Sequence, residues 1–356
     1  MIQNNRTPYL DHLRVLAAVA VIVIHITNQA AAALDARSFQ WQALNILNSL
    51  SRWCVPVFLM ISGSLFLCRD IPLKTLYSKY IARLAAAYGI WSAIYALAMP
   101  VKNLLLQPDY QISLQQIYTD LILGQSHMWF LPMMIGIYMC LPVFRLITGS
   151  EKMAGYYLLL SFLSAFLIPQ ILDVCSDLLG ASALPWIDPI RQLLSGMYLQ
   201  LVAGYGFYFV LGWWLSRAEL SKTQQTVIYA LGITGFLATI LLNGLISWHT
   251  HTPYKHYYSN HSVNVALQAV AVFTWFRCRK LENKRLNGLI CRLAQASFGV
   301  YLGHNFILRI LSTFGLDSSS VPPLLYVPML SVIVTVISFG CACLLRKIPF
   351  CRKWMV

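Results

Sequence analysis

Charged residues, above all acidic ones, are scarce in this sequence. Only 11% of its 356 residues are charged, and 12 Asp and Glu stand against 26 Lys and Arg. Soluble domains carry about 25% charged residues, so together with a hydrophobic content of 58% this composition excludes an ordinary soluble domain. The net charge of +14 is not a sign of nucleic-acid binding here, because membrane proteins accumulate basic residues on their cytoplasmic side.

Motifs of several enzyme classes are also missing. The sequence has no G-x-S-x-G turn and no Walker A loop. None of its eight histidines is followed five positions later by aspartate, so the His-x4-Asp motif of glycerolipid acyltransferases is absent. The nine cysteines include no C-x-x-C pair and are interpreted as packing residues. Four histidines in segment 248–261 have no Cys or carboxylate beside them, so no metal site is expected.

Long hydrophobic runs, by contrast, recur along the whole chain. They predict an all-α, polytopic integral membrane protein with about ten transmembrane helices in one membrane-embedded domain, residues 1–356. The runs cover approximately residues 13–33, 53–68, 82–99, 128–145, 154–172, 196–215, 226–247, 262–276, 296–314 and 324–345. A cleaved signal peptide is an alternative for the first run, but Asp11 and His25 favour an uncleaved span.

The basic residues are distributed unevenly about these runs. With a cytoplasmic N-terminus, 20 of the 26 Lys and Arg residues fall on the cytoplasmic side of the ten predicted spans. This is the positive-inside pattern. It predicts that both termini are cytoplasmic, that segments 34–51 and 248–261 lie outside, and that membrane lipids surround the protein.

The first run carries ionisable residues that a lipid-facing helix would avoid. Arg14 and His25 are 11 positions apart, which at about 100° per residue places them on one helix face, ~16 Å apart along the axis. Asp11 precedes Arg14 by three positions and joins the same stripe. Ionisable residues inside a membrane are costly, which favours a functional role. The alternative for His25 is a hydrogen-bonded residue between packed helices.

Four blocks of this sequence resemble those of the acyltransferase 3 family of bacterial membrane acyltransferases. Arg14 and His25 in LDHLRVLAAVAVIVIH match the family's Arg-x10-His pattern. The other blocks are SRWCVPVFLMISGSLF, HMWFLPMM and ASFGVYLGHNFIL, with matching positions at Arg52, Pro56, Phe58, Ser62, Gly63, His127, Trp129, Phe130, Leu131, Ser297, Phe298, Gly299, Tyr301 and His304. The blocks keep the family's order, and NILNSLSRWCVPVFLMISG is similar to the branch that O-acetylates enterobacterial common antigen.

This resemblance implies an O-acetyltransferase of the bacterial inner membrane. Its expected donor is acetyl-CoA, with no permanently bound cofactor, and its expected acceptor is a hydroxyl of a cell-envelope or lipid-linked glycan, such as enterobacterial common antigen or O-antigen. Catalysis is assigned to His25, with Arg14 and Asp11 in support. His25 would accept the hydroxyl proton or carry the acyl group as an acyl-histidine, and the sequence leaves both mechanisms open.

The resemblance also assigns residues to the two substrates. Arg14, Lys79 and Arg83 would hold the CoA phosphates. Family members often have Arg-x-x-Arg at the start of the third span, but Tyr80 occupies the first of these positions. Arg83 matches the second arginine, and Lys79, next to Tyr80, would supply the first charge as a point charge without the guanidinium fork. The acceptor-binding or supporting residues are Arg52, His127, Trp129, Ser297, Tyr301 and His304, the last three on one helical stripe that packing alone explains equally well.

Two other classes of function fit part of the pattern. A transporter or flippase of a lipid-linked sugar also needs charges inside the membrane, although the inverted repeats that would favour it are not visible. A sensor or structural membrane protein would not need Arg14 and His25 on one helix face.

Overall fold

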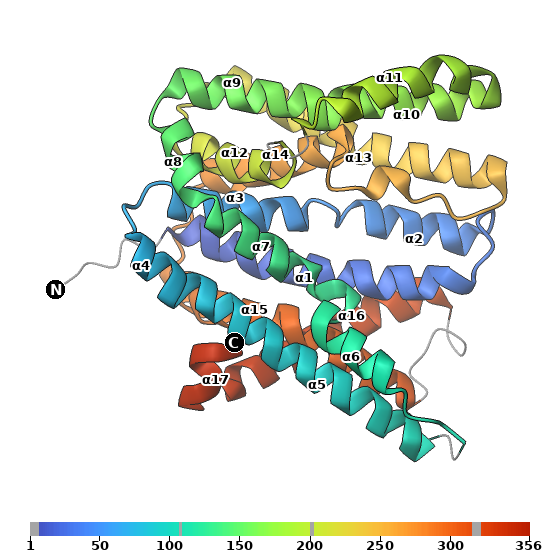
Figure 1. Ribbon diagram of the computed structural model, residues 1–356, viewed down its shortest axis with the longest axis vertical. Coiled ribbons are helices and arrows are strands. Elements are labelled where there is room, and N and C mark those ends of the chain that lie inside the picture. The colour runs from blue at the N-terminus through green and yellow to red at the C-terminus, as the bar shows by residue number, and fades with distance from the viewer. Residues whose placement is uncertain (1–6, 107–108, 200–202, 315–321) are drawn as a thin grey trace. The chain divides into compact units, whose positions relative to one another are not determined.

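Helices account for all the regular secondary structure in the described part of the chain. The computed structural model describes residues 7–106, 109–199, 203–314 and 322–356 (Figure 1). The all-α prediction is confirmed over these residues. The α-helices are α1 Pro8–Ala30, α2 Phe39–Ser49, α3 Cys54–Phe66, α4 Leu73–Thr75, α5 Ala82–Leu106, α6 Leu114–Leu123, α7 Phe130–Met139, α8 Leu141–Thr148, α9 Glu151–Phe162, α10 Ile168–Leu179, α11 Leu184–Gly196, α12 Tyr205–Arg217, α13 Lys222–Thr250, α14 Val263–Cys278, α15 Lys284–Thr313, α16 Pro323–Leu345 and α17 Pro349–Trp354.

Shorter helical segments join these elements. The 3₁₀ turns are η1 Ala31–Ala33, η3 Ser126–Trp129, η5 Gly180–Ala183 and η7 His256–Tyr258, and the π-helical segments are η2 Leu76–Ile81 and η4 Leu163–Leu167. Because η2 runs into α5, and η4 joins α9 to α10, these π segments lie within longer continuous helices.

Six helical segments of the described chain are long and apolar enough to cross a membrane, or seven if a bent pair, Leu114–Met139 with Leu141–Thr148, forms one span. They are Pro8–Ala33, Phe39–Phe66, Leu73–Leu106, Glu151–Gly196, Lys222–Thr250 and Pro323–Leu345. The count of about ten is therefore not confirmed. The apolar runs 196–215 and 262–276 form only the 13-residue α12 and the 16-residue α14, whereas a bilayer crossing needs about 20 residues.

The segment 34–51 was expected to be an outward loop, but most of it is helical. It contains α2, whose N-terminus is capped by the Ser38 hydroxyl accepting a hydrogen bond from the Trp41 amide. This helix and α3 form one apolar stretch of 28 residues. Trp41 and Leu44 are buried, so α2 contributes to the core instead of only connecting two spans.

The chain divides into two compact units that are each assembled from distant segments. Unit 1 comprises residues 1–69, 143–294 and 317–331, and unit 2 comprises residues 70–142, 295–316 and 332–356. The helices α15 and α16 each contribute residues to both units. The single-domain expectation for residues 1–356 stays a prediction.

In unit 1, glycines allow two pairs of helices to pack backbone against backbone. A Cβ at Gly63 in α3 would overlap the carbonyl group of Phe209 in α12, and one at Gly212 would overlap the backbone of Met60. Such small residues are how helices approach closely in membranes. Between α13 and α14, a Cβ at Gly235 would meet the Asn264 carbonyl oxygen at 2.5 Å. Figure 1 shows α10 and α11 side by side as a hairpin in the same unit.

The first helix of unit 1 is the element that carries Arg14 and His25. It starts after Thr7 in an extended conformation, with Pro8 in the first turn, where a missing N–H costs nothing. Its buried face, which includes Leu13 and Ile22, packs against α2, α3 and α14. The predicted first span is confirmed as one continuous helix.

Unit 2 is organised around the long helix α5, which α6, α7 and α17 contact. The C-terminal segment folds back onto it: the indole N–H of Trp91 donates to the Met355 carbonyl oxygen at 3.1 Å. Tyr95, one turn further along α5, donates its hydroxyl to the Leu302 carbonyl oxygen of α15 at 2.9 Å. Trp91 and Tyr95 therefore each fix a segment that comes more than 200 positions later in the chain.

Candidate functional site

An ion pair lies near the start of α1. The Arg14 guanidinium is 3.5 Å from the Asp11 carboxylate, and their side chains are 32% and 12% exposed. The predicted stripe of Asp11 and Arg14 is thus a real contact, because an i,i+3 spacing brings side chains together on a helix. His25 stands three turns further on the same helix and is partly buried.

A polar network occupies the other end of α1, one turn beyond His25. The Asn48 amide of α2 donates to Thr27 Oγ1 at 2.7 Å and to Asn28 Oδ1 at 3.0 Å. Asn48 Oδ1 accepts a hydrogen bond from Arg52 Nε at 2.6 Å. Arg52 also lies within electrostatic range of His25. The network therefore links the predicted acceptor-binding Arg52 to the turn of α1 that follows His25.

Arg52 is positioned from a second side by the segment after α13. Its guanidinium stacks over the ring of Tyr258 at 4.1 Å from the centroid, a favourable cation–π arrangement. The Tyr258 hydroxyl donates to Asn45 Oδ1 at 2.5 Å. Arg52 is consequently fixed by neighbours on α2 and on η7, which limits the rotamers that it can adopt.

A cavity of about 530 Å³ opens beside Arg52. This volume lies in the range of small-molecule sites, about 300–1,000 Å³. Each residue that lines it has a polar group in its side chain; they are Asn28, Arg52, Tyr205, Lys255, His256, Tyr258, Ser259 and Asn260. Hydrogen-bonding groups and an aromatic ring in one concave surface are what a sugar needs for recognition. We refer to it as the Arg52 cavity.

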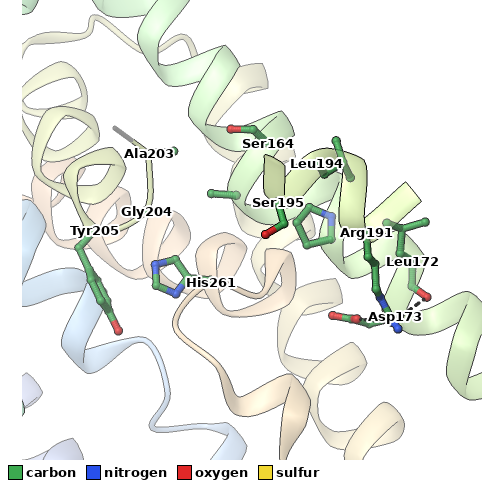
Figure 2. A pocket seen from close by; sticks show the side chains of 12 residues that line it. Ser164, Leu172, Asp173, Arg191, Leu194, Ser195, Ala203, Gly204, Tyr205 and His261 are labelled. Carbon is green, nitrogen blue, oxygen red and sulfur yellow. Dashed lines mark hydrogen bonds and ion pairs between the residues drawn. The ribbon is translucent and has the colours of Figure 1, made fainter. Parts of the chain in front are cut away.

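A second cavity, of about 510 Å³, shares Tyr205 with the first. Figure 2 shows Asp173 and Arg191 facing each other on one side of it and Tyr205 with His261 on the other. Arg191 pairs with Asp173 at 2.8 Å. Most of the remaining lining is apolar or small, including Leu172 and Leu194.

One carboxylate links the two cavities. Asp173 Oδ2 accepts a hydrogen bond from Nε2 of His256 at 2.8 Å. This hydrogen bond, together with the negative charge of Asp173, raises the pKa of His256 above its ordinary value. The protonated, positively charged form of His256, which lines the Arg52 cavity, is therefore favoured relative to a free imidazole.

The loop that carries these residues is anchored to α10. The hydroxyls of Tyr254 and Tyr257 both donate to the Asp177 carboxylate, at 2.9 Å and 2.7 Å. Burial and these hydrogen bonds to a carboxylate raise the pKa of both phenols, so they stay protonated donors. The anchoring holds the wall of the Arg52 cavity in place.

Two predicted histidines, His127 and His304, lie together in unit 2. The rings of His127 and His304 meet edge to face, 5.3 Å apart, and the Tyr301 hydroxyl donates to the His127 carbonyl oxygen. His304 is fully buried, and its Nδ1 donates to the Tyr301 carbonyl oxygen at 2.7 Å. In a neutral ring this leaves the lone pair on Nε2, as a general base requires. The structure thus unites three residues that the sequence placed in two separate blocks.

The other predicted residues of unit 2 have separate surroundings. Ser297 is buried and Trp129 is 39% exposed. Lys79 is exposed, with its ammonium 5.6 Å from the Tyr80 ring centroid. Arg83 donates to the Val356 carbonyl oxygen at 2.7 Å and lies over Phe298 at 5.7 Å. Arg83, one of the predicted donor-binding residues, therefore contacts Phe298 of the block ASFGVYLGHNFIL and also Val356.

Sequence reasoning missed Asn28, Asn48, Lys255 and His256 as site residues. One signal was present, because Asn48 precedes Arg52 by four positions, close enough for the hydrogen bond that joins them across the turn after α2. For Lys255 and His256 no local signal existed, since their distant neighbours at the cavity come from α1, from the turn before α3 and from α12.

One family model matches the chain over most of its length. It is described as an acyltransferase domain, Acyl_transf_3, and matches residues 7–343. No curated protein and no solved structure matches the chain. The resemblance to the enterobacterial common antigen branch is accordingly supported by no relative.

Proposed function

The chain belongs to the acyltransferase 3 family and is a multi-pass membrane acyltransferase, and from this premise we propose that it moves an acetyl group from acetyl-CoA to a hydroxyl of a cell-envelope or lipid-linked glycan. The proposed acceptors include enterobacterial common antigen and O-antigen, and the proposed location is the bacterial inner membrane. Acyl transfer as such follows from the family. The acetyl-CoA donor, the glycan acceptor and the inner-membrane location are what we propose.

One observation carries this proposal most directly: His25 is one helical turn from Asn28, which lines the polar Arg52 cavity. A sugar in this cavity would be near His25, while a donor bound toward Arg14 would approach along α1 from the other end. The distance along the axis between Arg14 and His25, ~16 Å, is one that the extended pantetheine arm of CoA can bridge.

The proposed chemistry needs a base at the meeting point of the two substrates. As the sugar oxygen attacks the thioester carbon, its proton passes to His25, the C–S bond breaks and an ester C–O bond forms. The proton is then available to the departing CoA thiolate. An acyl-histidine formed first on His25 would use the same positions, and the arrangement of α1 is compatible with both.

The proposed orientation places both termini in the cytoplasm and the Arg52 cavity outside. The 20 of 26 basic residues on one side of the predicted spans support it. A cysteine introduced at exposed position 251 should react with a membrane-impermeant maleimide in intact cells. Labelling only after the cells are permeabilised would reverse the orientation.

Binding of the acyl donor is expected to depend on Arg14 and on Arg83, as the family resemblance implies. We expect Arg14→Gln and Arg83→Gln each to raise the KM for acetyl-CoA roughly tenfold, because a charge-assisted bond to a phosphate is lost. Lys280→Gln, in the basic segment before α15, is the matched control and should change KM little. Equal effects at all three positions would indicate general electrostatic attraction instead of a binding site.

The proposal as a whole is tested by acetyl transfer in vesicles that contain the purified protein. Acetyl-CoA labelled in its acetyl group is supplied on one side and an envelope glycan on the other, and labelled glycan is measured after alkaline release of the ester. A transporter or flippase of lipid-linked sugar would move glycan without consuming acetyl-CoA. That outcome would contradict the proposed function.

A further inference from the structure

The charged side chains that line the Arg52 cavity are all basic. Three of the residues that line it are basic, namely Arg52, Lys255 and His256, and none of the described residues that line it is Asp or Glu. Only His256 has a carboxylate partner, Asp173, which lies behind it and lines the neighbouring cavity. No ion pair joins Lys255 or Arg52 to a carboxylate among the described residues.

Two of these cations repel each other. Burial, followed by the charge of Arg52, lowers the pKa of Lys255 below its ordinary value. Like charges held close together in a partly desolvated site destabilise the empty site. A bound anion removes this repulsion and adds charge-assisted hydrogen bonds, which are stronger than neutral ones.

The arginine is also held in advance of any ligand. Arg52 donates through Nε to Asn48 Oδ1 at 2.6 Å and stacks on Tyr258 at 4.1 Å. These contacts hold the guanidinium at the cavity wall, so a ligand need not order it, and less conformational entropy is lost on binding. Asn260 and Ser259 add neutral polar groups around the charged ones, as expected for a ligand that is a sugar with one charged substituent.

We infer that the Arg52 cavity binds an anionic substituent of the acceptor glycan, a carboxylate or a phosphate, and so selects acidic glycans over neutral ones. This inference rests on the proposed function, whose acceptor it specifies. The two sources share the same chemistry: a uronic acid within the glycan carries a carboxylate, and the diphosphate of a lipid-linked sugar carries phosphate oxygens. The anion would lie against Arg52 and Lys255, beside the turn of α1 that leads to His25.

Direct binding to the purified full-length protein in detergent tests the inference without any acetyl-CoA. Three probes are titrated calorimetrically: an oligosaccharide with glucuronate residues, the same oligosaccharide with its carboxyl groups reduced to alcohols, and a nucleotide-free sugar diphosphate. We expect at least one anionic probe to bind about tenfold more tightly than the neutral oligosaccharide, with an affinity that decreases as salt is added.

Variants at position 255 identify the cavity as the site. Lys255→Gln should weaken binding of the anionic probe about tenfold, and Lys255→Arg, which keeps the charge, should retain most of it. Lys222→Gln is the matched control, because Lys222 is an exposed lysine at the opposite end of α13. Since Lys255 is exposed, these variants should fold, and unchanged thermal unfolding would verify it.

The outcomes separate the sources and the two proposals. Tighter binding of the glucuronate probe identifies a uronic acid, and tighter binding of the diphosphate identifies the lipid-linked end of the glycan. Equal affinity for charged and neutral probes, or equal losses in Lys255→Gln and Lys222→Gln, overturns the inference. Anion binding that depends on Lys255, without any acetyl transfer in vesicles, would leave the inference standing and contradict the proposed function.

Discussion

Replacing His25 with glutamine should abolish acetyl transfer while leaving the protein folded and inserted. Glutamine can form hydrogen bonds, but it cannot accept a proton at neutral pH, so the base is lost while the shape is nearly kept. A general base contributes ~10²–10⁴-fold to a rate, so turnover of labelled acetyl-CoA in vesicles should decrease by at least about 100-fold. The side chain is partly buried, beside a turn that contributes Asn28 to the Arg52 cavity, and His25→Ala should give the same result.

The control for this experiment is His249→Gln, in which an exposed histidine in the last turn of α13 is changed. It should retain wild-type turnover. Near wild-type turnover in His25→Gln would contradict the base role and would make His25 a packing residue. His304 would then be the next residue to test, because its Nδ1 is used as a donor and its Nε2 has the lone pair.

Replacing Gly63 with alanine should have the largest effect on stability. The added Cβ would overlap the backbone carbonyl group of Phe209. This group is part of α12, so it cannot move unless the whole helix shifts. Overpacking costs typically 1–3 kcal/mol even where side chains can adjust, so we expect a loss of roughly 3 kcal/mol or more. The measurement is the thermal unfolding midpoint of the purified protein in detergent, with the yield of inserted protein beside it.

The same change should also impair activity, because α3 begins just after Arg52 and α12 begins with Tyr205, which lines both cavities. Gly136→Ala in α7 is the matched control, since a Cβ there meets no atom within 4 Å. Equal midpoints for Gly63→Ala and wild type would show that the two backbones have more room than the structure gives them.

Local sequence spacing correctly predicted the features that helix geometry alone controls. The all-α class follows from apolar runs, because only helices satisfy every backbone group within such a segment in lipid. The contact of Asp11 with Arg14 follows from their i,i+3 spacing. The stripe of Tyr301 and His304 follows in the same way, and its partner His127 was already a candidate, although nothing in the spacing indicated that their rings would meet.

The number of spans depended on more than hydropathy. The run 196–215 is long enough to cross a bilayer, but its helix α12 has only 13 residues, and the short run 262–276 forms a helix α14 of only 16 residues. Hydropathy measures how apolar a segment is, whereas the length of its helix depends on caps and breaks. Gly204 is such a break: it precedes α12 with a φ of 83°, a backbone conformation that favours glycine, so the helix begins only at Tyr205.

The Arg52 cavity is what only the tertiary structure decided. Arg52 was a candidate from its sequence block. Its cation–π partner Tyr258, however, is hydrogen-bonded to Asn45, 213 positions away in the sequence. Lys255 and His256 reach the cavity because α13 and α14 pack on each other and Tyr257 is anchored to α10 through Asp177. From the sequence alone, Lys255 and His256 belong only to a polar loop. Contacts between distant segments depend on how whole helices pack, and no periodicity within one segment records that packing.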